Sequence, residues 1–180
     1  MIIAESFTEI EKMLLSGGIG VIRTDTLYGL VASAGNQVAV ERVYALKSRD
    51  EKKSPIVLIG SVDQLFDAVD TPSMFESYWP GKVSIILPST DSPSWIQRDN
   101  RSVAYRLPDN SGLQHLLKTT GPLIAPSANP EGQTPASTIN EAVAYFGDAV
   151  DFYVDGGTVT NNEPSKLIRF LKNGAVEVLR

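Results

Sequence analysis

Short apolar runs alternate with helical patterns along most of this 180-residue chain, and this alternation constrains the fold more than any other feature. Ile19–Ile22 and Val83–Leu87 have the length of strands, whereas the spacing of apolar residues in Ser6–Ser16 and Val38–Lys47 predicts helices. Strands that alternate with helices are typical of a layered α/β domain. An Asn-Gly pair at 173–174 predicts a hairpin near the end of the chain, so we expect a mixed sheet.

The other expected elements show the same two patterns. Further strands are expected at Pro55–Ile59, Val103–Leu107, Leu123–Ala125, Phe152–Val154, Leu167–Leu171 and Ala175–Leu179. Further helical segments are expected within Val62–Tyr78 and at Gly112–Lys118 and Ile139–Phe146. The run Val83–Leu87 is almost wholly apolar, which indicates a central strand. Since no repeat or linker divides the chain, we expect residues 1–180 to form one α/β (α+β) domain, with helices flanking the sheet.

Composition and charge exclude several kinds of site. The chain has no cysteine, which rules out disulfides, thiolate zinc sites and cysteine nucleophiles. Its one histidine, His115, lies in a helical pattern without partners, so a histidine-rich metal site is excluded and a Ser-His-Asp enzyme is not expected. A net charge of −5 counts against a general nucleic-acid binder. Without a signal-like start or an apolar run of about 18 residues, we expect a soluble, cytoplasmic protein.

The segment Ala125–Gly132 is the strongest indication of a ligand site. It follows the apolar pair Leu123-Ile124, and ligands of open α/β sheets bind in loops at the carboxyl ends of strands. Ser127 and Asn129 stand at alternate positions, so both can face one polar ligand. The same residues could instead form a turn that caps the next helix, and both readings remain open from this segment alone.

Two further segments carry groups that suit an anionic or polar ligand. In Thr24–Leu30 the Thr26 hydroxyl can bind a polar ligand, although a threonine followed by an aspartate also caps helices. Lys47 and Arg49, with Lys53 close behind, form the densest basic cluster. Such cations match phosphate or carboxylate oxygens, but they also compensate the dipole at the end of a helix.

Arg106 ends an apolar strand on the same face as Ser102. An arginine in such a strand is costly unless it has a partner. The partner can be a ligand or a structural ion pair, and we favour the ligand.

Taken together, these segments resemble the YrdC-like family of threonylcarbamoyl-AMP synthases. The family's motifs occur in the same order over nearly the whole chain, as Arg23–Leu30 for P-T-[DE]-T-x-Y-G-L, Lys47-Ser48-Arg49 for K-x-R, Trp79-Pro80-Gly81 for W-P-G, Ala104–Pro108 for A-V-R-x-P, Ser127-Ala128-Asn129 for S-x-N and Pro164-Ser165 for P-S. Each motif is weak alone, but six in register make a chance similarity very unlikely.

The resemblance implies a twisted, concave mixed sheet that makes threonylcarbamoyl-adenylate and pyrophosphate from ATP, L-threonine and bicarbonate. It implies Mg²⁺ held through the triphosphate, no metal site built by the protein, and delivery of the product to the machinery that modifies tRNA. By motif it assigns Thr26, Arg106, Ser127 and Ser165 to threonine. It assigns Arg49, Lys53, Ser102, Asn129, Ser137 and Arg180 to the nucleotide. Lys47, with Arg49, would act at the reacting phosphate or carbamate.

The chain departs from the family pattern at a few positions. Arg23 and Lys82 stand where prolines are usual. Leu58 stands where many members have a threonine-side histidine, which predicts a more apolar amino-acid pocket. The stretch from Arg49 to Pro55 is one residue longer than usual, so the nucleotide contact stays open among Lys53, Ser137 and Thr138. From its length we expect the family's short bacterial form.

Two other functions fit parts of this pattern. A concave surface with local cations could hold RNA without catalysis, although the low pI and the lack of interleaved aromatic and basic residues count against it. A related domain that forms a carbamoyl-adenylate from carbamoyl phosphate would share the same motifs. The chain lacks the accessory zinc-finger and acylphosphatase-like segments of such enzymes.

Overall fold

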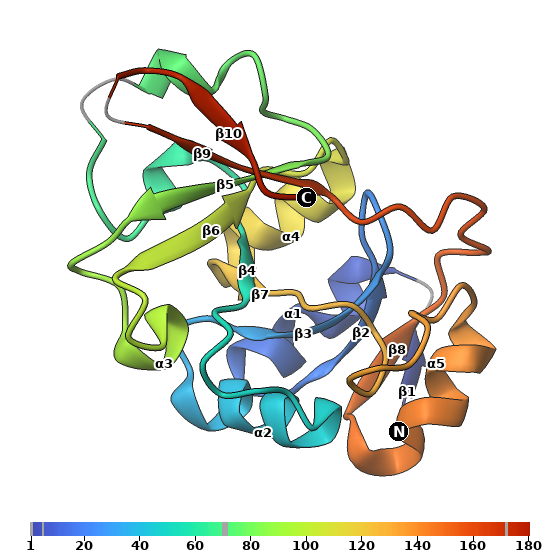
Figure 1. Cartoon of the computed structure of the whole chain (residues 1–180). Helices are drawn as coiled ribbons and strands as arrows, with labels where there is room; N and C mark the ends of the chain where they lie inside the picture. The colour runs from blue at the N-terminus through green and yellow to red at the C-terminus, as the bar shows by residue number, and fades with distance from the viewer. Residues whose placement is uncertain (1, 5, 70–71, 172) are drawn as a thin grey trace.

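One twisted mixed sheet organises the part of the chain that the computed structural model describes, which is residues 2–4, 6–69, 72–171 and 173–180 (Figure 1). Its ten strands run in the order β1-β8-β2-β3-β7-β4-β6-β5-β9-β10. The strands are β1 (Ile2–Ala4), β2 (Gly20–Arg23), β3 (Tyr28–Ser33), β4 (Ile56–Leu58), β5 (Val83–Pro88), β6 (Ser102–Arg106), β7 (Leu123–Ile124), β8 (Phe152–Val154), β9 (Lys166–Phe170) and β10 (Val176–Val178).

Five α-helices and three short 3-10 turns connect these strands in the described residues. The helices are α1 (Phe7–Leu15), α2 (Gln37–Lys47), α3 (Ser94–Gln97), α4 (Ser111–Thr120) and α5 (Ile139–Phe146). The 3-10 turns are η1 (Val62–Gln64), η2 (Pro72–Phe75) and η3 (Gly147–Ala149). No helix among the described residues is long and apolar enough to cross a membrane.

Local sequence explains where the main helices begin and end. Ser6 and Glu9 form a reciprocal capping box at the start of α1. The Asn36 side chain accepts the backbone N–H of Ala39 at the start of α2. This helix ends at Ser48, whose backbone is left-handed with φ of 51°. The end of α2 therefore has a defined geometry, which matters because the basic cluster follows directly.

The pairing confirms a mixed sheet. β4 pairs with β6 in parallel, and β5 pairs with β9 in parallel, while β5 and β6 are antiparallel. β9 and β10 form the antiparallel hairpin expected at the end of the chain. β5 has partners on both sides, as its apolar sequence predicts.

Two apolar clusters fill the interior around the sheet. One contains side chains from α1 and α4, which contact each other, and includes Ile10, Leu14 and Leu117. The other contains side chains of α2 and α5 together with those of the central strands. These clusters hold the strands rigidly, so the loops at their ends are presented in fixed positions.

One expectation was wrong in detail, at the start of β3. The segment Tyr28–Ser33 forms the strand β3, although the sequence placed its first residues in a ligand-binding turn. All but the last residue of β3 are buried, so no alternation of polar and apolar residues marks it as a strand. The helical segments expected within Val62–Tyr78 are confirmed, in the described residues, as the short 3-10 turns η1 and η2.

Candidate active site

Several loops that are distant in the sequence meet around one cavity of about 390 Å³. The walls come from the turn between β2 and β3, the residues after α2, the ends of β4 and β6, the loops after β7 and before β9, and the C-terminal residue. The lining residues are Thr24, Thr26, Leu27, Tyr28, Gly29, Arg49, Ile56, Arg106, Ala125, Pro126, Ser127, Pro135, Asn162, Pro164, Ser165 and Arg180. This volume lies at the lower end of the range for small-molecule sites.

Backbone hydrogen bonds fix the loop after β7 against the start of β3. The N–H of Leu30 donates to the carbonyl of Pro126 at 2.8 Å, and the N–H of Ala128 donates to that of Tyr28 at 2.8 Å. Gly29 and Ser127 form an isolated antiparallel bridge between them. The two motifs therefore form one wall, as expected if both serve one ligand.

Within this wall, Ser127 and Asn129 have different surroundings. Ser127 lines the cavity, and its hydroxyl donates to Asn129 Oδ1 at 2.6 Å. Asn129 does not line the cavity and is buried, and its amide donates to the carbonyls of Pro130 at 2.9 Å and Gln133 at 2.7 Å. Ser127 is thus available to a ligand, whereas Asn129 holds the loop together.

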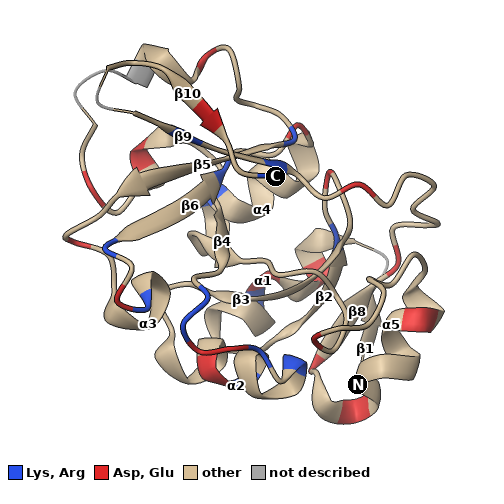
Figure 2. Cartoon of the chain, viewed as in Figure 1, with Lys and Arg blue, Asp and Glu red and all other residues tan. Residues whose placement is uncertain are grey.

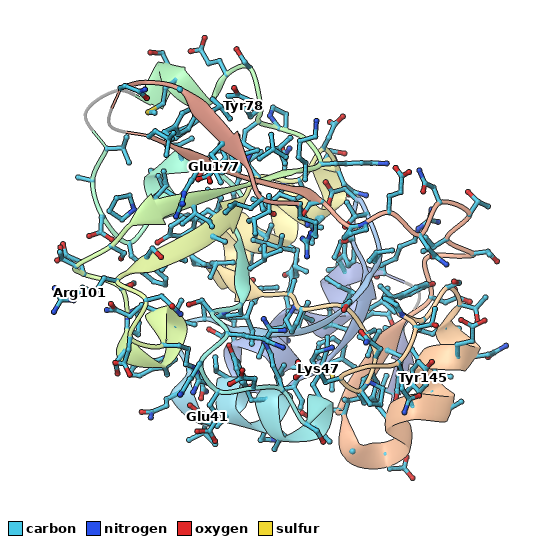
Figure 3. The ribbon with its side chains drawn as sticks, viewed as in Figure 1. Glu41, Lys47, Tyr78, Arg101, Tyr145 and Glu177 are labelled. Carbon is cyan, nitrogen blue, oxygen red and sulfur yellow. The ribbon has the colours of Figure 1, made fainter. Side chains whose placement is uncertain are left out.

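Lys47 lies beneath the same loop, between α2 and the segment that follows β7 (Figure 3). Its ammonium donates to the carbonyls of Ser127 and Asn129, the second at 2.6 Å, and to Asn129 Oδ1 at 3.2 Å. Lys47 is only 3% exposed, and burial lowers its pKa to about 8, with the positive charge of Arg49 adding to the shift.

These contacts place Lys47 behind the cavity wall and not in it. It does not line the cavity, and its three N–H groups already have oxygen partners. The proposed role of Lys47 at the reacting phosphate or carbamate therefore stays a prediction. Its observed role is to hold the loop that carries Ser127.

Three arginines make the cavity electropositive although the chain as a whole is acidic. Figure 2 shows basic segments at the end of β6, after α2 and at the C-terminus. Arg49 is half-buried, and its Nη2 donates to the carbonyl of Ser54 at 3.1 Å. Arg180 donates from Nη2 to the carbonyl of Ser165 at 3.1 Å, and burial lowers its pKa, with Arg49 contributing. None of the lining residues in the described part of the chain is a carboxylate, so the cavity suits an anion.

Arg106 combines the two roles that the sequence left open. It lines the cavity, and its Nη2 also lies 3.1 Å from Asp25 Oδ1. The side chains of the two partners are 4% and 3% exposed. Thr24 Oγ1 accepts a further hydrogen bond from Arg106 Nη2 at 3.3 Å, and it lies 3.2 Å from the Thr26 hydroxyl. The Arg106 side chain therefore forms the ion pair with Asp25 and also lines the cavity.

The cavity brings together only part of the predicted site. Six predicted residues line it, namely Thr26, Arg49, Arg106, Ser127, Ser165 and Arg180. Lys47, Lys53, Ser102, Asn129 and Ser137 do not. Lys53 pairs with the exposed Glu131, and Ser102 lies at the opposite end of β6 from Arg106. Ser137 contacts Asn162, which does line the cavity and which no sequence signal indicated.

The apolar part of the cavity also differs from expectation. Leu58 is fully buried in the cluster beneath α1 and α4 and does not line the cavity. Ile56, two residues earlier on the same strand, does line it. The substitution at position 58 therefore does not make the amino-acid pocket more apolar, and Ile56 provides the apolar side chain from this strand.

Ser127→Ala is expected to reduce mainly turnover, whereas Asn129→Ala is expected to reduce mainly stability. Ser127→Ala should lower turnover at least about tenfold and cost at most about 1 kcal/mol of unfolding free energy, because it removes one hydrogen bond from the cavity wall. Asn129→Ala should cost about 2 kcal/mol or more, because the hydrogen bonds of the buried Asn129 side chain to two carbonyls and its contact with the Lys47 ammonium are lost together. Denaturant unfolding and turnover measured on both variants test this. A Ser127→Ala variant that is fully active would exclude Ser127 from the site.

Comparison with known proteins agrees with the geometry. The family model of the Sua5/YciO/YrdC proteins, described as "Telomere recombination", matches residues 12–180. The threonylcarbamoyl-AMP synthase of Marinobacter nauticus is 34% identical over 167 residues, which are 87% of each chain. That of Pseudomonas paraeruginosa is 35% identical over 171 residues, or 92% of each chain.

A solved structure of P. abyssi Sua5 complexed with L-threonine superposes with a TM-score of 0.89 at 25% identity. The match covers 100% of the present chain and 57% of the Sua5 chain, so the present chain spans little more than half of that protein. The resemblance noted in the sequence is therefore confirmed in sequence and in three dimensions. This chain belongs to the Sua5/YciO/YrdC family.

Proposed function

We propose that this protein is a threonylcarbamoyl-AMP synthase, which forms L-threonylcarbamoyl-adenylate from ATP, L-threonine and bicarbonate and releases pyrophosphate. The observation that carries the proposal is the composition of the cavity wall. Three arginines and the hydroxyls of Ser127 and Ser165 line it, together with the turn at Thr24, and none of its described lining residues is aspartate or glutamate. Relatives of similar length carry this name, and the similar Sua5 structure contains L-threonine.

The chemistry matches this composition. The amine of threonine and bicarbonate condense to a carbamate with loss of water. A carbamate oxygen then attacks the α-phosphorus of ATP, and the bond between that phosphorus and the pyrophosphate oxygen breaks. Both reactants are anions, so the protein contributes by positioning them and by stabilising negative charge. The carbamate is already ionised, so the step needs no general base. None of the described lining residues is histidine, aspartate or glutamate, which agrees with this mechanism.

We assign the lining residues to threonine or to the phosphates by their hydrogen-bond partners. Arg106, Thr26, Ser127 and Ser165 are proposed to bind the threonine part, since the first two share the hydrogen-bond network at Thr24. Arg49 and Arg180 are proposed to face the phosphates, because each guanidinium is held by a backbone carbonyl. Lys47 acts behind them by holding the loop.

The described part of the chain offers no cluster of magnesium ligands at the cavity. Magnesium prefers carboxylate and water oxygens, and the described lining residues include no carboxylate. No group of three or more histidines, cysteines or acidic residues occurs anywhere in the described chain. We therefore propose that Mg²⁺ arrives on the triphosphate, and that the adenylate then passes in the cytoplasm to the enzymes that modify tRNA.

Release of pyrophosphate tests the proposal. It should require ATP, threonine and bicarbonate together, and omission of any one should reduce it to background. Release that does not depend on threonine, or a requirement for carbamoyl phosphate, would favour the carbamoyl-adenylate alternative. RNA binding without any turnover would favour the binding module.

The amino-acid specificity follows from the cavity wall. Ile56 offers apolar contact for the threonine methyl group, and one methyl group is worth about 1–3 kcal/mol. Serine should therefore be used about tenfold to a hundredfold less efficiently than threonine. Valine should be used about a hundredfold less efficiently, because the partner of the hydroxyl is left unpaired. Values of kcat/KM for the three amino acids test this prediction. Equal values for threonine and valine would show that Thr26 and Ser165 do not bind the threonine hydroxyl.

A further inference from the structure

Asp25 and Arg106 form an ion pair that separates two cavities. Arg106 lines the cavity described above, whereas Asp25 lines a second cavity of about 470 Å³ on the other side of the turn between β2 and β3. Thr24 lies in the walls of both. Asp25 is therefore placed behind Arg106 and does not reach a ligand in the first cavity.

Burial makes this ion pair a weak source of stability. Burial raises the pKa of Asp25, and the charge of Arg106 only partly offsets that effect. Burial likewise lowers the pKa of Arg106, against the opposing effect of Asp25. Both Asp25 oxygens and Arg106 Nε are buried without a hydrogen-bond partner of good geometry. For such a pair the loss of water costs about as much as the attraction returns.

The geometry indicates that the pair fixes the orientation of the Arg106 guanidinium. Arg106 ends β6, and its side chain would otherwise be free to choose among several rotamers. Contacts of Nη2 with Asp25 at 3.1 Å and Thr24 Oγ1 at 3.3 Å tie one edge of the guanidinium to the turn. The rest of the guanidinium is then held in one orientation in the cavity wall. A cationic donor held in this way can give a charge-assisted hydrogen bond to a carboxylate without first losing rotamer freedom.

We propose that Asp25 is a positioning residue that orients Arg106 toward the carboxylate of the amino-acid substrate. This inference rests on the proposed function, in which Arg106 binds the threonine part. Asp25 touches no reacting atom. It determines the KM for threonine through Arg106 and leaves the nucleotide end, at Arg49 and Arg180, unaffected.

The test compares Asp25→Asn, Asp25→Glu and a matched control. Glu41 on the outer side of α2 pairs with Arg98 at 3.0 Å, and neither lines the cavity (Figure 3). Glu41→Gln therefore takes a carboxylate from an arginine in the same way at a distant place. Asp25→Asn should raise the KM for threonine about tenfold or more and that for ATP less than about twofold. Asp25→Glu, which keeps the charge, should lie between wild type and Asp25→Asn, and Glu41→Gln should match wild type.

Two results would overturn the inference. One is a folded Asp25→Asn variant with the wild-type KM for threonine, and the other is an equal rise of both KM values. If Asp25→Asn does not fold, Asp25→Glu carries the same comparison, since a lengthened carboxylate displaces the guanidinium and should still raise only the threonine KM.

A spectroscopic measurement separates this inference from the proposed function. In ¹⁵N-labelled wild-type protein the Nη2 hydrogens of Arg106, which contact Asp25 and Thr24, should exchange slowly with water, and in Asp25→Asn they should exchange fast. Slow exchange in a wild-type protein without threonine-dependent turnover would refute the proposed function alone. Equal exchange in wild type and variant would refute the positioning role even in an active enzyme.

Discussion

Replacing Arg49 with alanine is expected to lower kcat/KM for ATP by about 30-fold to 1,000-fold. Removal of one cation that stabilises charge in the transition state costs about 2–4 kcal/mol. Arg49 lines the cavity and is fixed there by the carbonyl of Ser54 and by the ring of Tyr44, 5.6 Å from its guanidinium carbon. Loss of these contacts should cost only about 1 kcal/mol of unfolding free energy, so the protein stays folded.

Lys52→Ala is the control for this experiment. Lys52 belongs to the same basic cluster, but it is exposed and does not line the cavity. It should retain wild-type kcat/KM for ATP. If Arg49→Ala and Lys52→Ala have equal, small effects, the cluster acts only through its general charge and Arg49 is not part of the nucleotide site.

Replacing Lys47 with methionine is expected to lower the unfolding free energy by about 3 kcal/mol or more and to abolish most turnover. Methionine keeps the apolar stem of lysine, but the carbonyls of Ser127 and Asn129 and the Asn129 side chain lose their common donor. Each buried acceptor left without a partner costs about 1–3 kcal/mol. Denaturant unfolding and pyrophosphate release, both measured on the purified variant, test the prediction.

Lys12→Met is the matched control, because Lys12 stands in the last turn of α1 as Lys47 does in α2, but is exposed. Lys12→Met should keep the unfolding free energy within about 0.5 kcal/mol of wild type and turnover within about twofold. A Lys47→Met variant with normal stability and no turnover would instead place the ammonium on a substrate phosphate. That outcome would require the loop to move when ATP binds.

Periodicity in the sequence predicted the helices well because their apolar residues face one side. α1, α2 and α5 begin and end within about two residues of the predicted bounds. The strand β3 was missed for a physical reason. Its residues are buried on both faces, so the segment lacks alternation, and its polar flanking turn resembles a ligand loop.

The site could be predicted only where a residue's own chemistry decides its role. Thr26, Arg49, Arg106 and Ser127 line the cavity as predicted. The position of Lys47 could not be predicted, because its partners are backbone carbonyls some 80 residues away along the chain. The pairing of Arg106 with Asp25 likewise depends on how the turn after β2 meets the end of β6.

The same limit explains the residues that lie outside the cavity. Ser102 shares a face of β6 with Arg106, but the cavity lies at one end of the strand. Lys53 follows the basic cluster closely, yet it turns outward to Glu131. Ser102 was placed correctly on β6, but only the three-dimensional arrangement of the loops shows that neither Ser102 nor Lys53 lines the cavity.

The most direct test of the proposed function is identification of the product. The purified protein is incubated with ATP, L-threonine and ¹³C-bicarbonate, and the nucleotides are analysed by mass spectrometry. The cavity predicts a threonylcarbamoyl-adenylate that carries the ¹³C label in its carbamoyl group, formed together with an equal amount of pyrophosphate. An adenylate that lacks threonine, or complete absence of a labelled adenylate from an otherwise folded protein, would contradict the account.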